Sequence, residues 1–238
     1  MTIRALFLDL DQTLIDDDLA RDLSIEGAVS EIAAAWPELD LSQLPETYMR
    51  VSQDHWQTVA RDVQRGVFTG DRWHYEAWSL SLQECGCTDA SIAKAALDAY
   101  SQLRIQIVKP FDDATALLAS SLGGMKLAII TNGPDQTQRQ KVRATGLDRA
   151  VHAVLISGEL GVAKPSKAIF DLALEQVGVT PEEAIHVGDS LESDVAGAQN
   201  SGITAVWLNR DGKRRDKRQP EPDHEITTLA ELPGLLDG

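Results

Sequence analysis

Residues 127–146 read LAIITNGPDQTQRQKVRATG, and this stretch contains the repeating unit that determines the fold. Its short apolar run, Leu127–Ile130, is typical of a buried β-strand, and the polar residues that follow it suit a turn. Pro134 favours the first turn of a helix, and Gly146 is typical of the position just after a helix end. The stretch therefore predicts a strand, a polar turn and a helix, in that order.

The same alternation extends along the chain. Short apolar runs predict buried strands at Ala5–Leu8, Leu127–Ile130, Val154–Ile156, Ala184–Val187 and Ala205–Leu208. Helical patterns with suitable end residues occur at Asp112–Leu122, Pro134–Thr145, Ser166–Val177 and Leu191–Ser201. Because strands that alternate with helices favour a parallel sheet with helices on both faces, the predicted fold class is α/β.

Residues 15–111 differ from the rest of the chain because they contain no clear strand. Helical patterns are found near Asp18–Trp36, Leu44–Gly66, Asp71–Cys85 and Asp89–Leu103. The simplest organisation is an all-helical domain, residues 15–111, inserted into an α/β core formed by residues 1–14 and 112–238.

Charge and composition narrow the class of protein. The 238 residues include 22 Lys and Arg and 37 Asp and Glu, which gives a net charge of −15 and argues against nucleic acid or an anionic membrane as the main partner. No apolar segment approaches the ~20 residues that a membrane span needs, and Ala5–Leu8 is too short for a signal peptide. Cys85 and Cys87 are spaced for neither a redox pair nor a zinc site. We expect a soluble cytoplasmic protein with reduced thiols, and both a monomer and a homodimer fit.

Polar side chains follow the ends of three predicted strands. They are Asp9 and Asp11, Thr131 and Asn132, and Asp189 with Asp194. Ligands of open parallel sheets bind beyond the carboxyl ends of the strands, so these side chains are expected to meet at one edge. Lys164 can reach the same edge because Pro165 keeps it out of helical geometry.

This set of residues suits phosphoryl chemistry. Clustered carboxylates favour a divalent cation, and Mg²⁺ prefers one or two carboxylates, such as those of Asp9 and Asp189, with water and a substrate phosphate. Thr131, Asn132 and Lys164 offer groups that bind phosphate oxygens. A carboxylate can attack the phosphoryl group to form an aspartyl-phosphate, and an acid two residues later can protonate the leaving alkoxide and then deprotonate water.

Taken together, these residues resemble the four ordered motifs of the haloacid dehalogenase-like hydrolase superfamily. The matching segments are Asp9-Leu10-Asp11-Gln12-Thr13, Thr131-Asn132-Gly133, Lys164-Pro165 and Gly188-Asp189 with Asp194. The resemblance covers nearly the whole chain and extends to the inserted helices, which match the cap of subfamily I. It implies a Rossmann-like parallel-sheet core and an inserted all-α cap domain.

The resemblance also implies roles for the acidic residues. Asp9 would be the nucleophile, and Asp11 the general acid and base that also offers its backbone carbonyl to Mg²⁺. Asp189 would be a direct metal ligand. Asp194 would be a more distant or water-mediated one.

Further roles follow from the same resemblance. Thr131 and the backbone amide of Asn132 would hold the phosphoryl group, and Lys164 would bridge Asp9 and the phosphate. Thr13 would brace the loop by hydrogen bonding.

The implied function is that of a Mg²⁺-dependent phosphatase for a small phosphorylated metabolite. Sugar phosphates including acylneuraminate 9-phosphate, nucleoside monophosphates and phosphoglycolate all fit. A phosphomutase of the β-phosphoglucomutase type shares the Asp-x-Asp core and a helical cap. Dehalogenases of the family usually lack an acid at the position of Asp11. A non-enzymatic binding protein would be expected to have lost one of the catalytic set, which is complete here: Asp9, Asp11, Lys164 and Asp189.

Other residues have ordinary and functional interpretations. Arg72 and His74, in the predicted cap, are candidates for substrate contact, although an ordinary surface arginine is an equally good interpretation of Arg72. His186 is expected in the core with a satisfied ring. Asp16 to Asp18 are expected to form a solvated hinge and the start of a helix. Residues 210–218, with six basic and two acidic side chains, are expected to form a solvated loop after the last strand.

Overall fold

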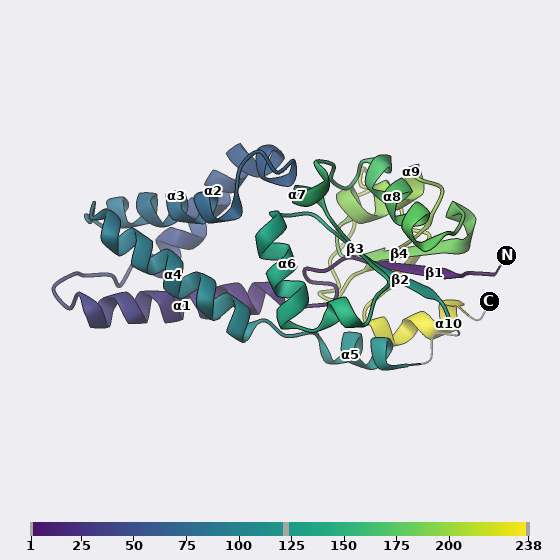
Figure 1. Cartoon of the computed structure of the whole chain (residues 1–238), viewed down its shortest axis with the longest axis horizontal. Helices are drawn as coiled ribbons and strands as arrows, with labels where there is room; N and C mark the ends of the chain where they lie inside the picture. Colours follow the sequence, from purple (N-terminus) through teal and green to yellow (C-terminus); the bar gives the residue numbers. More distant parts are fainter. Residues whose placement is uncertain (1, 121–123, 237–238) are drawn as a thin grey trace.

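The structure, a computed structural model, describes residues 2–120 and 124–236. Its centre is a six-stranded parallel sheet in the order β3-β2-β1-β4-β5-β6 (Figure 1). The strands are β1 (Ala5–Leu8), β2 (Lys126–Thr131), β3 (Ala153–Ile156), β4 (Ala184–Gly188), β5 (Thr204–Leu208) and β6 (His224–Ile226). The first five agree with the predicted strands to within one residue at each end. β6 was not predicted, because only Ile226 of its three residues is buried and an edge strand needs no longer apolar run.

Both faces of the sheet are buried, as the α/β class requires. In β1, Leu6 and Leu8 pack in one apolar cluster, while Ala5 and Phe7 pack in another on the opposite face. This alternation follows from the two-residue period of a strand. The helices around the sheet are α5 (Asp112–Ala119), α6 (Asp135–Ala144), α7 (Ser157–Leu160), α8 (Lys167–Val177), α9 (Ala196–Asn200) and α10 (Leu232–Leu236).

One predicted helix differs from the structure at its start. The segment expected as a single helix over Leu191–Ser201 begins as a π-helical turn, Leu191–Val195, and continues as α9. Such turns insert one extra residue and are frequent at functional sites. The predicted end of the first core helix, at Leu122 and Gly123, lies outside the described residues.

Four helices after β1 form a second body beside the sheet (Figure 1). They are α1 (Asp17–Ala35), α2 (Leu44–Gln64), α3 (Gly70–Glu84) and α4 (Ala90–Ile107), close to the predicted ranges. They share their own apolar cluster, in which the rings of Tyr48 and Trp78 stack with centroids 3.8 Å apart. We propose that residues 15–111 are the cap domain, since the chain enters and leaves it at one place, where the backbone N–H of Asp16 donates to the carbonyl of Lys109.

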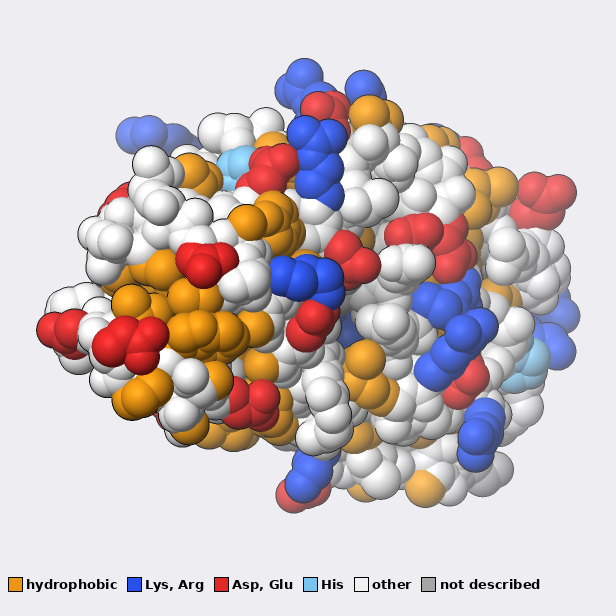
Figure 2. Space-filling view, turned by 60° about the vertical axis from the view of Figure 1, so that its left-hand side comes forward, with side chains coloured by type: hydrophobic (Ala, Val, Ile, Leu, Met, Phe, Trp, Pro, Cys, Tyr) orange, Lys and Arg blue, Asp and Glu red, His pale blue; other side chains and the backbone are white. Residues whose placement is uncertain are grey.

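The exposed apolar side chains are unevenly distributed. Of the seven large exposed ones in the described part of the chain, six lie between residues 19 and 105: Leu19, Leu23, Met49, Val67, Leu80 and Ile105. Figure 2, turned toward that side of the molecule, shows apolar side chains gathered on one part of the surface and charges of both signs around them. Both cysteines are free. Among the described residues, no helix is both long and apolar enough to cross a membrane.

Candidate active site

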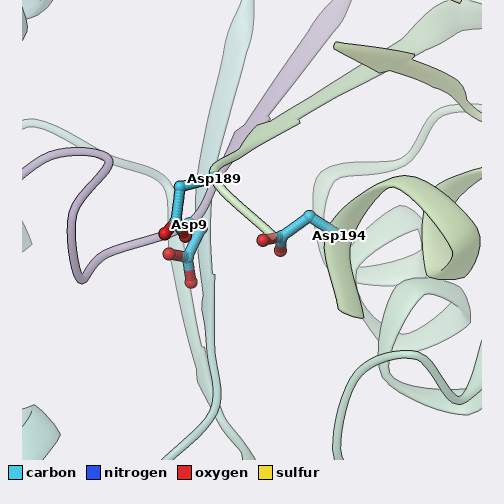
Figure 3. A group of neighbouring side chains, drawn as sticks. All are labelled: Asp9, Asp189 and Asp194. Atoms are coloured by element: carbon cyan, nitrogen blue, oxygen red, sulfur yellow. The ribbon is translucent and has the colours of Figure 1, made fainter. Parts of the chain in front are cut away.

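Three carboxylates meet at the carboxyl edge of the sheet. Asp9 follows β1, Asp189 follows β4, and Asp194 lies in the π-helical turn. Each offers one oxygen to a group whose members all lie within 4.8 Å of one another, and Figure 3 shows Asp194 approaching Asp9 and Asp189 from the other side. Because three different segments supply them, the sheet topology places these acids together, as the sequence predicted.

Lys164 is the cation of this group. Its ammonium donates to Asp9 at 2.5 Å and to Asp194 at 2.6 Å, and the residue is only 4% exposed. Asp194 also contacts Nε2 of His186 at 2.9 Å and accepts from the backbone N–H of Ser190 at 3.1 Å. His186 is buried as expected, but its ring is not fully satisfied, because Nδ1 has no hydrogen-bond partner among the described residues. Its contact with Asp194, a candidate site residue, was not predicted.

The protonation of the three acids depends on their partners. Burial alone would raise the pKa of Asp194, but Lys164 and His186 hold that pKa well below its usual range. Burial, with Asp194 nearby, raises the pKa of Asp189 to about 6. Burial also raises the pKa of Asp9 well above its usual value. Lys164 lowers this pKa in part, but the neighbouring acids raise it further. One ammonium thus leaves the three carboxylates with excess negative charge. An all-oxygen donor set with this excess fits a divalent cation such as Mg²⁺.

The residues predicted to hold phosphate lie at the end of β2. The side chain of Asn132 donates to the carbonyl of Lys164 at 2.9 Å and accepts from its backbone N–H at 2.9 Å. The hydroxyl of Thr131 accepts from Nε2 of Gln138 at 2.6 Å. Asn132 therefore fixes the loop that carries Lys164, which keeps the ammonium beside Asp9.

Asp11 is held by helix α6 and not by the three acids. Its two carboxylate oxygens accept from Lys141 and from Gln138, both at 2.9 Å. Burial, with Asp17 nearby, raises the pKa of Asp11, and Lys141 partly offsets this. Lys141 and Gln138 are spaced i, i+3, so both lie on one face of α6, but in the sequence they resemble ordinary polar positions of a surface helix.

The expectation that Asp17 is a solvated hinge residue is wrong. Asp16 caps α1, in line with the expected helix start, but Asp17 accepts from Lys141 at 2.8 Å and from Arg104 at 2.5 Å. Burial would raise the pKa of Asp17, yet Lys141 and Arg104 lower it to about 2. The first turn of α1 is thereby bound to α4 and α6 by a buried group of charges.

The two cap candidates are in different surroundings. Nδ1 of His74 lies 2.8 Å from the hydroxyl of Tyr48, and burial lowers the pKa of His74 to about 3, so the ring is neutral. His74 borders a cavity of about 30 Å³ together with Arg104 and Lys141. Arg72 instead lies over the ring of Phe68 and donates to Glu76 at 2.8 Å. Substrate contact by either residue stays a prediction.

Two hollows lie within reach of these elements. One, of about 320 Å³, borders Asp189 and is also lined by Gln12, Asp18, Arg210 and Lys213. The other, of about 430 Å³, lies between α1, α2 and α3, and its lining includes Arg21, Met49, Gln53, Trp56 and Trp73. The first adjoins one acid of the sheet edge, Asp189, and its charged lining suits a polar substrate.

Two expectations about loops are corrected by the structure. Thr13 is buried, and its hydroxyl has no hydrogen-bond partner among the described residues, so it does not brace the turn. The carbonyl of Thr13 instead accepts from Arg210 at 2.9 Å. Arg210 is half-buried and therefore does not belong to a solvated loop, although most of residues 211–218 are exposed.

Comparison with known proteins gives consistent results. A family model for haloacid dehalogenase-like hydrolases matches residues 3–202. Phosphoserine phosphatase of Thermus thermophilus is 33% identical over 97% of this chain and 98% of its own length. N-acylneuraminate-9-phosphatase of Mus musculus is 28% identical over 98% of this chain and 94% of its own. The crystal structure of the HAD-hydrolase YfnB of Bacillus subtilis, bound to magnesium, is 24% identical and covers all of both chains with a TM-score of 0.76, which shows a shared fold.

Proposed function

This chain belongs to the haloacid dehalogenase-like hydrolases, and we propose that it is a Mg²⁺-dependent phosphatase acting on a small phosphorylated metabolite through an aspartyl-phosphate on Asp9. Its class, a phosphoric monoester hydrolase, rests on the family and on the phosphatases that match nearly its whole length. The observation that carries the proposal is the group of three carboxylates around one lysine at the sheet edge.

In the first step, Asp9 attacks the phosphorus atom. Lys164 orients the carboxylate of Asp9 through one oxygen and neutralises charge on the phosphoryl oxygens, which Thr131 and the amide of Asn132 also bind. A bond forms between Asp9 and phosphorus, and the bond between phosphorus and the leaving oxygen breaks. Asp11 gives its proton to that oxygen, so the product leaves as an alcohol.

In the second step, Asp11 takes a proton from water, and the resulting hydroxide attacks phosphorus. The bond to Asp9 breaks, which releases inorganic phosphate and restores the free carboxylate. Lys141 and Gln138 hold the side chain of Asp11 on the side of α6. In this proposal the same side chain carries out both proton transfers.

The metal would be held by Asp9 and Asp189 through their carboxylates and by Asp11 through its backbone carbonyl. Bound Mg²⁺ supplies positive charge that offsets the charge on the transferring phosphoryl group. Asp194, already engaged by Lys164 and His186, fits a supporting role for the metal better than direct ligation.

The side chain of Asp11 favours a phosphatase over a dehalogenase, because halide release needs no acid at that position. The phosphomutase alternative shares the same core, so its distinction rests on products. Transfer of the phosphoryl group back to a sugar would give an isomeric sugar phosphate, whereas a phosphatase gives inorganic phosphate.

The experiment is release of phosphate from an aryl phosphate and a panel of phosphorylated metabolites, with Mg²⁺ or with a chelator. We expect Mg²⁺-dependent release by the wild type and a loss of at least about a thousandfold in Asp9→Asn. Asp171→Asn, the same change at an exposed ion pair, is the matched control and is expected to retain wild-type activity.

The intermediate has its own readout. After acid quenching during turnover, the peptide that contains Asp9 is expected to carry one phosphoryl group in mass spectrometry. Phosphate release across the panel no faster than that of Asp9→Asn would falsify the proposal, and an isomeric sugar phosphate as the product would favour the mutase.

A further inference from the structure

The turn that follows Asp9 has a strained backbone. Gln12 has φ of 60°, and in the part of the chain that the structure describes it is the only residue other than glycine with a positive φ. Left-handed backbone is unfavourable for residues with a side chain and persists where the surroundings impose it. The contacts that impose it here are therefore part of what shapes the turn between Asp9 and Thr13.

One guanidinium holds two consecutive carbonyls of this turn. Nε of Arg210 donates to the carbonyl of Gln12 at 3.3 Å, and Nη2 donates to that of Thr13 at 2.9 Å. The side chain of Gln12 makes a separate pair of bonds to Asp18, at 3.0 and 3.1 Å. Because the hydroxyl of Thr13 makes no such bond within residues 2–120 and 124–236, Arg210 supplies the support that this hydroxyl was expected to give.

Arg210 is itself fixed from two sides. Nη1 and Nη2 donate to the two oxygens of Asp113 at 2.8 and 2.9 Å, and the guanidinium lies 4.0 Å from the ring centroid of Phe111. Asp113 also accepts from the hydroxyl of Thr228 at 2.7 Å and from the backbone N–H of Leu229 at 2.9 Å. A planar fork of this kind cannot be replaced by a lysine, which has one terminal nitrogen.

We propose that Arg210 is a positioning residue that clamps the catalytic turn, residues 9–13, to α5 and to the segment after β6. The residue lies beyond residues 3–202, the part matched by the family model. The inference rests on the proposed function, since its effect on rate presupposes that Asp9 and Asp11 carry out the chemistry. Arg210 acts on the backbone that aims these two acids and is not itself a catalytic residue.

The clamp has a specific kinetic consequence. The groups proposed to bind the phosphoryl oxygens, Thr131, Asn132 and Lys164, lie on other segments, and among the described residues none of them bonds to Arg210, although Lys164 donates to Asp9 of the turn. Release of the turn should therefore misplace the reacting acids while leaving substrate binding largely intact. Misplacement of reacting groups can lower the rate by up to about a hundredfold, so we expect kcat to fall and KM to change little.

The kinetic test compares Arg210→Ala and Arg210→Lys with the wild type, using Arg214→Ala, an exposed arginine of the same basic segment, as the matched control. We expect kcat to fall between about tenfold and a hundredfold in both Arg210 variants, with KM within about twofold. Arg214→Ala should behave as wild type. Added methylguanidinium should restore part of kcat in Arg210→Ala and leave Arg210→Lys and Arg214→Ala unchanged.

A second readout does not depend on activity. Hydrogen exchange of a peptide spanning residues 9–16 should become at least about tenfold faster in Arg210→Ala, while a peptide from β3 exchanges as in the wild type. Asp113→Asn keeps the arginine but weakens the contacts that hold its guanidinium, so exchange of residues 9–16 should become faster to a smaller degree. This variant replaces Arg210→Ala in the test if Arg210→Ala does not fold.

The outcomes separate the two proposals. An active wild type with unchanged kcat in Arg210→Ala overturns the clamp and leaves the phosphatase intact. A wild type without Mg²⁺-dependent phosphate release contradicts the phosphatase, and exchange of residues 9–16 then decides the clamp alone. Unchanged exchange in both Arg210→Ala and Asp113→Asn overturns the clamp whatever the activity.

Discussion

Two groups of charged side chains meet at the turn of residues 9–13, and they differ in charge balance. The sheet-edge cluster contains three carboxylates and one ammonium: Asp9, Asp189, Asp194 and Lys164. The junction cluster, where α1, α4 and α6 meet, contains two carboxylates and two cations: Asp11, Asp17, Lys141 and Arg104. The first is short of positive charge, whereas the second is neutral.

The two clusters shift the pKa of an aspartate in opposite directions. Burial, with Asp194 nearby, raises the pKa of Asp189 to about 6 in the sheet-edge cluster. Burial acts on Asp17 too, but Lys141 and Arg104 lower the pKa of Asp17 to about 2. The surplus of carboxylates over cations in the sheet-edge cluster therefore favours binding of a cation, whereas Asp17, which has two cationic partners, fits a structural contact.

Asp17→Asn should break the neutral cluster. The change leaves Lys141 and Arg104 sharing the single carboxylate of Asp11, and the loss of one partner of a buried ion pair costs about 3–5 kcal/mol. We expect the free energy of unfolding, measured with urea at neutral pH, to fall by about that amount. Addition of Mg²⁺ should not restore it.

The loss of stability in Asp17→Asn should also depend on pH. Because the folded pKa of Asp17 is lowered from 3.8 to about 2, its contribution to stability is complete above its ordinary pKa and is lost as pH falls toward 2. The difference in unfolding free energy between wild type and Asp17→Asn should shrink over that window. A difference that stays constant down to pH 2 would contradict the assignment of the lowered pKa to this pair.

Asp189→Asn should have the opposite effect on stability, because it removes a carboxylate from the sheet-edge cluster, which has an excess of negative charge. Removal of a residue that only supports a metal ligand typically lowers metal affinity or activity 10- to 100-fold. For Asp189→Asn we therefore expect the rate of phosphate release to fall about a hundredfold, which corresponds to about 2.7 kcal/mol in activation free energy. Without Mg²⁺ the variant should melt at a higher temperature than the wild type, because one repelled carboxylate is gone.

Calorimetry with and without Mg²⁺ checks this. Mg²⁺ should raise the melting temperature of the wild type and of the exposed control Asp171→Asn, but not that of Asp189→Asn. Equal stabilisation of all three proteins by Mg²⁺ would place the cation elsewhere.

The two clusters also differ in how far the sequence predicts them. The sheet-edge cluster could be anticipated because Asp9 and Asp189 come directly after predicted strands or within two residues of them, with Asp194 shortly after, and parallel strands bring their carboxyl ends to one edge. The junction cluster could not, since Asp17 looks like a solvated acid at a helix start and Lys141 like a surface lysine. Which polar face of a helix becomes buried depends on how distant elements pack, and periodicity alone does not contain that information.

Arg210 and His186 are two further residues whose contacts could not be predicted from the sequence. His186 was assigned to the core from its apolar strand, and nothing in the sequence shows that the π-helical turn aims Asp194 at it. Arg210 lies in a basic segment whose other members are mostly exposed, and its burial depends on Asp113, which is 97 residues away. The strands and helices follow from local pattern, while the second partners of the site residues follow from tertiary contact.

Arg104→Lys is the mildest change that separates charge balance from geometry in the junction cluster. Arg104 donates from Nη2 to the carboxylate of Asp17 at 2.5 Å and from Nη1 to its carbonyl at 2.9 Å. A lysine keeps the charge but loses one of these bonds, so unfolding free energy should fall by only about 1 kcal/mol. Arg104→Met, which removes the charge, should cost several times more in the same urea titration. If the two variants lose equal stability, the fork of the guanidinium and not the neutral charge count stabilises this junction, and the contrast between the clusters is one of geometry.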